Sequence, residues 1–192
     1  MTGNITGGAD VALAKDGAGT LTLSGAANSY TAGTTLSAGH LALGANNVVP
    51  DTGTFTFAGG ILDANSRTDI IGPLSMTANS TLNLNPGNGS GTVTFASMTA
   101  SAGTVLTING WTGLANTAGT DDHIFITADP GATLLSQIQF TGFGFAPGAI
   151  RLGTGEIVPV PEPINVALGI FATVLVMGGI VRRVRGRVCP QA

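Results

Sequence analysis

The chain has 192 residues, of which 30 are glycine and only 9% are charged. Ordinary soluble domains contain about 7% glycine and about 25% charged residues. With one lysine and one cysteine, the sequence excludes a basic nucleic-acid-binding surface and a disulfide scaffold. A hydrophobic share of 43% also argues against disorder driven by charge.

Charge is distributed unevenly along the chain. Residues 1–160 hold three basic and nine acidic residues, a net charge of −6, whereas residues 161–192 hold four arginines and one glutamate, a net charge of +3. An acidic body with a basic end predicts a chain of two parts. Gly, Thr, Ser and Asn are poor helix formers and dominate the first 155 residues, so the body is not expected to be a helical bundle.

The first residues lack the features of a secretory signal. Residues 1–6 have neither a basic n-region nor an apolar h-region. Residues 2–8 already resemble the middle of a repeat. Either the start of the sequence is misplaced or the chain is N-terminally truncated, the last part of a longer protein, and the second interpretation is favoured.

A glycine followed by alternating apolar and polar residues recurs between Asp10 and about Gly110. A period of two predicts short strands, and the Gly and Asn clusters between the copies predict turns. One apolar set should face inward while the intervening Thr and Asn face water. The predicted inward residues are Leu21, Leu23, Leu41, Leu43, Phe55, Phe57, Leu82, Leu84, Val93, Phe95, Leu106 and Ile108.

The copies are irregularly spaced, at 20, 14, 27, 11 and 12 residues from Leu21 onward. This irregularity argues against propeller blades of one fixed length and favours a solenoid whose rungs differ in loop length. In a solenoid, each rung buries its apolar face against the rungs above and below it. A β-sandwich has the same local pattern and stays open as the structural alternative.

Residues 17–25 (GAGTLTLSG), 28–36 (NSYTAGTTL) and 38–44 (AGHLALG) carry a family resemblance. Together they resemble the autotransporter-associated β-strand repeat over about residues 7–48, with Ala32 in place of the usual second glycine. The resemblance implies a right-handed parallel β-helix of the kind found in secreted passenger proteins.

After the repeats, residues 111–157 are predicted to form a terminal cap. An open solenoid end would expose apolar side chains and unpaired strand edges, which a cap would cover. Residues 132–139 are the one short helical piece expected in the body. Trp111, Phe143 and Phe145 either pack in the cap, the favoured interpretation, or stack on sugars.

Candidates for catalysis are few. Asp121, Asp122 and His123 are adjacent, and neighbours in a strand point to opposite faces, so they converge poorly on one substrate. Calcium binding by these aspartates and Asp129 fits no known calcium-loop spacing.

Three further carboxylates could in principle cleave a glycosidic bond, but a structural role is favoured for them. They are Asp51, Asp63 and Asp69, and the first two lie in turn-like stretches, where aspartate is common for backbone reasons. We predict no catalytic residue, no metal site and no cofactor.

The C-terminal part begins with Val-Pro-Val-Pro-Glu-Pro at residues 158–163, which predicts an extended, exposed segment. Residues 164–181 hold 18 residues without a charge. As a helix they would reach roughly 27 Å, near the ~30 Å hydrocarbon core, so they predict a transmembrane helix rather than a buried core helix. The basic tail, residues 182–187, should lie in the cytoplasm and leave the body outside it.

Pro-Glu-Pro, an apolar span and an arginine cluster in this order resemble the PEP-CTERM sorting signal over residues 160–187. The resemblance implies that the chain is a substrate of an exosortase, a membrane-embedded protease. Pro161, Glu162 and Pro163 would be the recognition element. The cytoplasmic anchor would consist of Arg182, Arg183, Arg185 and Arg187.

The sequence thus predicts an all-β chain, a short right-handed parallel β-solenoid followed by one C-terminal transmembrane helix. The expected domains are the solenoid repeats at 1–110, the cap at 111–157 and the sorting signal at 158–192. The expected function is that of an exported structural or interaction protein, first held in the cytoplasmic membrane and then at the cell surface or in the extracellular matrix.

The expected partners are an exosortase, the membrane through residues 164–181, and extracellular polysaccharide as a candidate ligand. No nucleic acid is expected. The alternatives are a polysaccharide-degrading enzyme on a β-helix, an autotransporter passenger fragment, and a membrane protein whose anchor is never cut.

Overall fold

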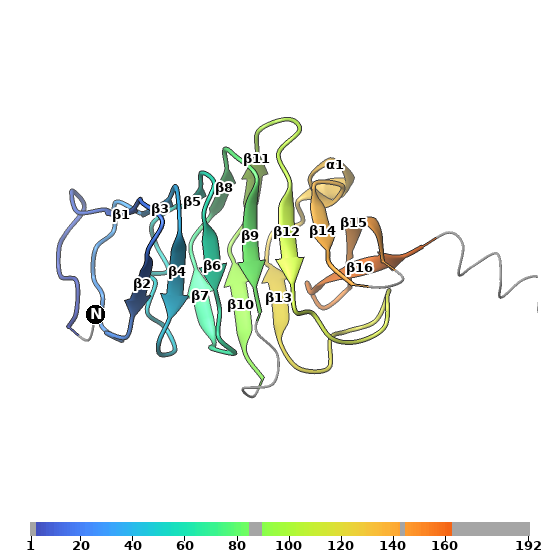
Figure 1. The fold of residues 1–192 in the computed structure, drawn as a ribbon, viewed down its shortest axis with the longest axis horizontal. Coiled ribbons are helices and arrows are strands. Elements are labelled where there is room, and N and C mark those ends of the chain that lie inside the picture. The colour runs from blue at the N-terminus through green and yellow to red at the C-terminus, as the bar shows by residue number, and fades with distance from the viewer. Residues whose placement is uncertain (1–2, 85–89, 143–144, 163–192) are drawn as a thin grey trace, which may run out of the picture. The chain divides into compact units, whose positions relative to one another are not determined.

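The computed structural model describes residues 3–84, 90–142 and 145–162. The chain divides into two units, Met1–Val160 and Pro161–Ala192, and every described residue except Pro161 and Glu162 belongs to the first. This first unit is mostly β-structure with parallel sheets (Figure 1).

Three parallel sheets make up the body. Sheet A contains β1 (Leu13–Lys15), β3 (Thr34–Leu36), β5 (Phe55–Phe57), β8 (Leu74–Met76) and β11 (Met98–Ala100). Sheet B contains β2 (Thr20–Leu23), β4 (His40–Leu43), β6 (Ile61–Asp63), β9 (Ser80–Asn83), β12 (Leu106–Asn109) and β14 (Ile138–Phe140). Sheet C contains β7 (Asp69–Ile71), β10 (Thr92–Phe95) and β13 (His123–Ile126).

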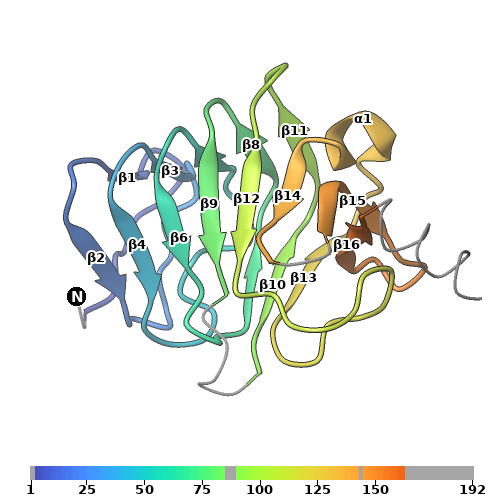
Figure 2. The same cartoon turned by 45° about the vertical axis from the view of Figure 1, so that its right-hand side comes forward.

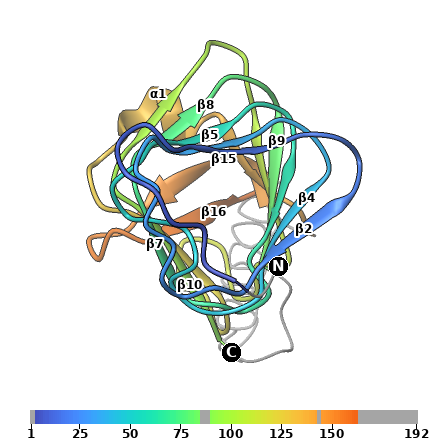
Figure 3. The same ribbon diagram turned by 90° about the vertical axis from the view of Figure 1, so that its left-hand side faces the viewer.

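The chain visits these sheets in a repeated order, and each visit to sheet B marks one rung (Figure 2). The first two rungs contain one strand of sheet A and one of sheet B, and sheet C is added in the third rung, where β7 follows β6. Viewed along the stack, the sheets lie on different sides of one coil (Figure 3). Since every ladder within the three sheets is parallel, the antiparallel β-sandwich alternative is wrong.

The core consists of apolar side chains that stack from rung to rung. In sheet B, for example, Leu21 pairs with Leu41, Leu41 with Leu62, and Leu62 with Leu82. All of the predicted inward residues are buried except Leu21, which is partly buried near the first rung. The period-two interpretation of the inward face is therefore confirmed.

The copies of the motif are not successive rungs, so their spacing does not give the length of a rung. Leu21 and Leu41 are true neighbours in sheet B, but Phe55 belongs to sheet A and Val93 to sheet C. Successive copies of the motif thus fall on different sides of the coil. The intervals are irregular because some join two strands of the same sheet in neighbouring rungs, whereas others join strands of different sheets.

Close backbone contacts mark the entry to sheet A. A Cβ atom at Gly33, where φ is +107°, would lie 2.5 Å from the carbonyl oxygen of Thr54. A Cβ atom at Gly53, one rung later, would lie 2.6 Å from the Cα atom of Gly33. The rungs approach here at a distance that only glycine permits.

The last rung is closed by a cap. Helix α1 (Gly131–Leu135) lies between β13 and β14 in the chain, where earlier rungs have a strand of sheet A. Strands β15 (Phe145–Arg151) and β16 (Ile157–Pro161) form a two-stranded sheet beyond β14. The predicted helix 132–139 is therefore shorter than expected, because residues 138–139 belong to β14.

Aromatic packing holds the cap together. Trp111 is buried, and its ring lies edge-on to Phe140 and Phe145 at centroid distances of 5.6 and 5.5 Å. This favours packing over sugar stacking for Trp111 and Phe145. Phe143 lies outside the described residues.

The proline-rich segment is extended as predicted, but its first part is not exposed. Val158 is fully buried in the core cluster, and Pro159 is buried as well. Both belong to β16, which pairs only with β15 among the described strands. Proline is tolerated there because a strand with one partner leaves half of its N–H groups outside the ladder.

The predicted fold, a solenoid followed by one transmembrane helix, must be corrected to a mostly β chain with parallel sheets. None of the helices formed by residues 3–84, 90–142 and 145–162 is long and apolar enough to span a bilayer, and α1 has only five residues. The predicted span, residues 164–181, lies outside the described residues. The length and apolarity of a segment are necessary for a transmembrane helix, but they do not by themselves establish that it forms one.

Gly53→Ala should lower the free energy of unfolding by about 1–3 kcal/mol, because the added Cβ atom forces two rungs apart. The measurement is denaturant unfolding followed by far-ultraviolet circular dichroism. Gly19→Ala is the matched control, since a Cβ atom there has no other atom within 4 Å. Its effect should stay within about 0.5 kcal/mol, and equal losses in both variants would contradict the close approach.

Candidate functional site

A row of polar side chains crosses the outer face of sheet B. Asn83 Nδ2 donates to Asp63 Oδ1 at 2.7 Å, and Asn109 Nδ2 donates to Asn83 Oδ1 at 2.9 Å. Thr141 continues the row by donating its hydroxyl to Asn109 Oδ1 at 2.9 Å. At the other end, His40 Nδ1 lies 2.7 Å from Asp63 Oδ2. Each member is bonded to its neighbour, so the row supports the register of the rungs.

Asp69 is a carboxylate inside the core. It is fully buried at the first position of β7, and its Oδ2 accepts hydrogen bonds from the backbone N–H groups of Val48 and Val49 at 2.8 and 3.3 Å. Its Oδ1 is buried and accepts no hydrogen bond from the described residues. Burial raises the pKa of Asp69 to about 7; the two backbone hydrogen bonds lower it, and the charge of Asp51 raises it.

The adjacent residues Asp121, Asp122 and His123 do not form one site. Asp121 Oδ2 accepts a hydrogen bond from the Thr112 hydroxyl at 3.2 Å. Asp122 is buried, and its Oδ1 accepts the backbone N–H of Gly91 at 2.5 Å. Burial raises the pKa of Asp122, against the lowering effect of that hydrogen bond. The two carboxylates thus serve different backbone and hydroxyl donors.

His123 instead pairs with a residue far along the chain. Its Nδ1 lies 2.8 Å from Oε1 of Glu156, which also accepts the backbone N–H of Gly119 at 2.9 Å. Glu156 is buried, whereas the His123 side chain is 29% exposed. This pair could not be predicted from the sequence, because His123 in β13 and Glu156 in the turn before β16 are 33 residues apart and no local pattern links them.

A hollow of about 360 Å³ lies beside this pair, on the outer side of sheet C. Thr94, Phe125 and Arg151 are among the residues that line it. The Arg151 guanidinium is held by two backbone carbonyls: Nε donates to Ile126 O at 3.0 Å and Nη2 donates to Thr127 O at 2.8 Å. Arg151 also lines a second hollow of about 480 Å³ next to α1.

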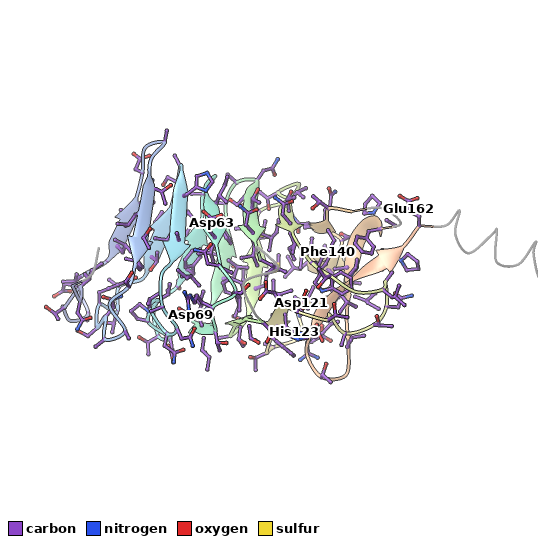
Figure 4. All side chains as sticks on the ribbon, turned by 60° about the horizontal axis from the view of Figure 1, so that its bottom comes forward. Asp63, Asp69, Asp121, His123, Phe140 and Glu162 are labelled. Atoms are coloured by element: carbon purple, nitrogen blue, oxygen red, sulfur yellow. The ribbon has the colours of Figure 1, made fainter. Side chains whose placement is uncertain are left out.

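The other carboxylates considered for catalysis do not converge. Asp63 lies on the outer face of sheet B, whereas Asp69 faces the core (Figure 4). Asp129 Oδ1 accepts the backbone N–H of Gly131 at 2.9 Å, and Asp51 lies in the exposed turn before β5. Within the part of the chain that the structure describes, no three His, Cys, Asp or Glu side chains are grouped as metal ligands.

Of the predicted sorting residues, Pro161 ends β16 and Glu162 follows it, and both are partly exposed. Pro163 lies outside the described residues, as do the four arginines of the predicted anchor, Arg182, Arg183, Arg185 and Arg187. The recognition and anchoring roles therefore stay predictions.

The first two rungs are held by unusual polar contacts. Lys15, the only lysine in the chain, is buried, and its Nζ donates to the carbonyl oxygens of Gly17 at 2.7 Å, Ala38 at 2.9 Å and Asp16 at 3.1 Å. Three carbonyl dipoles thus stabilise its charge and tie β1 to the turn before β4.

The side chains of Asn28 and Tyr30 form further hydrogen bonds in the first two rungs. Asn28 Nδ2 donates to the carbonyl oxygens of Gly25 and Val48, at 2.9 and 2.6 Å, and so bridges two rungs. The Tyr30 hydroxyl is buried and lies 2.9 Å from Thr34 Oγ1. These side chains join turns to strands in a segment that has little apolar bulk of its own.

This segment is the part of the chain that matches a known family. Residues 13–43 match the passenger-associated-transport-repeat family, an autotransporter-associated repeat. The match spans β1 to β4 and confirms the repeat that the sequence analysis identified there. It gives no support to the predicted sorting signal. No curated protein and no solved structure matches the chain.

Lys15→Met should lower the free energy of unfolding by about 1–3 kcal/mol, because the three hydrogen bonds of the buried ammonium group are lost. Chemical denaturation measures the loss, and Arg67→Met, at an exposed position, is the matched control. In the wild type, an amine-reactive reagent should modify Lys15 only after unfolding. Rapid labelling of Lys15 in native buffer would contradict its burial.

Asp69→Asn should flatten the pH dependence of stability between about pH 4 and 7. The pKa of Asp69 is about 7 in the folded chain and about 3.9 in an unfolded one, so the folded state holds the proton more tightly. The stabilisation is complete below about pH 4 and is lost as the pH rises toward 7. The wild-type free energy of unfolding should fall by up to about 1.4 kcal/mol per pH unit across this window.

The measurement is denaturant unfolding at several pH values for the wild type, Asp69→Asn and Asp10→Asn. Asp10 is exposed, so its variant should keep the wild-type slope. The difference between wild type and Asp69→Asn isolates the contribution of Asp69 from that of Asp122. Parallel slopes in all three proteins would show that the Asp69 carboxyl does not carry the effect.

Proposed function

We propose that the chain is an exported interaction protein of the cell surface or extracellular matrix. The observation that carries this proposal is the match of residues 13–43 to a passenger-associated transport repeat, at the start of a stack of parallel rungs. Such a stack presents its outward-facing residues along an extended surface, which suits binding.

The titratable side chains favour a binding role over a catalytic one, because they hold the structure together. Asp63, Asp69 and Asp122 accept hydrogen bonds that tie one rung to another. Glu156 fixes His123 and a loop N–H rather than a second carboxylate. An enzyme would need such carboxylates and histidines as acids, bases or nucleophiles. Here their contacts support a structural role instead.

An autotransporter passenger is the second candidate, because the matched repeat is associated with that class. The two candidates share export and differ in how the C-terminal end is processed. For the sorting-signal route, we propose that Pro161, Glu162 and Pro163 are recognised by an exosortase-type protease. Ile157 and Val158 are buried in the core cluster, so a cut that preserves the cap must fall after β16.

The test is to place an epitope tag in the exposed turn between Ala102 and Gly103 of the full-length protein in its native cells. We expect the tag to be accessible on intact cells or present in the medium, while a cytoplasmic marker is not. Intact mass should give a C-terminus shortly after Pro163 in the wild type and a longer product in Glu162→Ala, with Asp16→Ala as the control. A tag found only in the cytosol would overturn the proposal of export.

A further inference from the structure

The hollow beside sheet C contains a guanidinium, that of Arg151, which is fixed in position but is not part of an ion pair. Arg151 has five N–H donors, and two of them are used for the carbonyl oxygens of Ile126 and Thr127. Neither of the two ion pairs found among the described residues involves Arg151. Three donors and a full positive charge therefore remain for a ligand.

Two acidic side chains near the hollows that Arg151 lines already accept other hydrogen bonds. Glu156 accepts hydrogen bonds from His123 and the Gly119 N–H, and Asp129 accepts the N–H of Gly131. Neither carboxylate forms an ion pair with the Arg151 guanidinium. Because Arg151 is fixed by backbone carbonyls rather than by a carboxylate, its position does not depend on a counter-ion.

Besides Ile126, Thr127 and Gly155, the hollow is lined by three further threonines and one aromatic ring. Thr92, Thr94 and Thr154 supply hydroxyls that can both donate and accept, and Phe125 supplies an apolar surface. The volume of about 360 Å³ lies in the range of small-ligand sites, about 300–1,000 Å³. This combination suits a ring that has an apolar face, several hydroxyls and one carboxylate.

We propose that the Arg151 hollow binds a hexuronate unit of an acidic polysaccharide. The Arg151 guanidinium takes the carboxylate, the Phe125 ring covers the apolar face of the sugar, and the threonines bond to its hydroxyls. This inference deepens the proposed extracellular role and rests on it for its biological setting.

One hexuronate unit with a single carboxylate fits the few positive charges of the body better than a nucleic acid does. A nucleic-acid site needs several cations along a backbone, whereas Lys15, Arg67 and Arg151 are the only lysine and arginine residues before Arg182. Lys15 is buried, and Arg67 is not among the residues that line the hollow. One guanidinium is sufficient for one carboxylate, which it can bind through two parallel hydrogen bonds.

The test is isothermal titration of the full-length protein with a short oligogalacturonate at low ionic strength. The same oligomer as its methyl ester is the matched ligand control, since it keeps the rings and hydroxyls but loses the charge. We expect saturable binding of the acid that is at least about tenfold tighter than that of the ester, as hydrogen bonds to charged groups are the stronger ones.

Arg151→Gln should weaken binding of the acid by about tenfold or more, whereas Arg67→Gln, which removes the same charge elsewhere, should leave it within about twofold. Thr94→Val keeps Arg151 and the shape of the outer face and removes one hydroxyl, so it should weaken the acid and the ester alike, by about two- to tenfold. Trp111 fluorescence and far-ultraviolet dichroism check that each variant is folded.

Equal affinity for acid and ester, equal losses in the two arginine variants, or no saturable binding would each overturn the inference. Since the titration uses purified protein, its failure would leave the proposal of export standing. A protein that binds the oligomer but stays in the cytosol would instead overturn the proposed function and keep the binding site.

Discussion

The apolar side chains of each rung can be hidden from water only by the rungs beside it. Leu41 is fully buried because Leu21 and Leu62 lie in register on either side of it, and the same holds for each inner position of the stack. Stability is therefore a property of neighbouring pairs of rungs, and no rung could fold alone. At the two ends of the stack, apolar side chains and strand edges would be exposed to water. This accounts for the cap of α1, β15 and β16 over the last rung.

Stacking alone does not determine where each sheet begins, and buried polar side chains supply that information. The Asp69 carboxylate accepts the N–H groups of Val48 and Val49, which lie in the preceding rung at the place where later rungs have a strand of sheet C. Sheet C begins at β7, two rungs later than the other two sheets. The raised pKa of Asp69 reflects the energetic penalty of placing a carboxyl at a core position.

The sequence identified the inward faces because alternation is a local signal that needs no knowledge of the partner strand. It could not assign Phe55 and Val93 to their sheets, because this depends on how far the chain turns between copies. The contact of Lys15 with Ala38 and the pair His123–Glu156 could not be predicted either, because the partners lie 23 and 33 residues apart in the sequence. Pro159 was misjudged for a related reason, since its exposure depends on what packs beside β16.

The same alternation also explains where binding chemistry can reside. Inward positions are committed to the core, so only outward positions are free to differ between rungs. On sheet B, residues Asp63, Asn83 and Asn109 bond one another in a row, which leaves few of their donors and acceptors for a partner. On sheet C, Phe125 and Thr94 instead lie next to a guanidinium with unused donors. The difference arises because the cap, which covers the end of the core, also places Arg151 against the end of β13, where its guanidinium bonds to the carbonyl oxygens of Ile126 and Thr127.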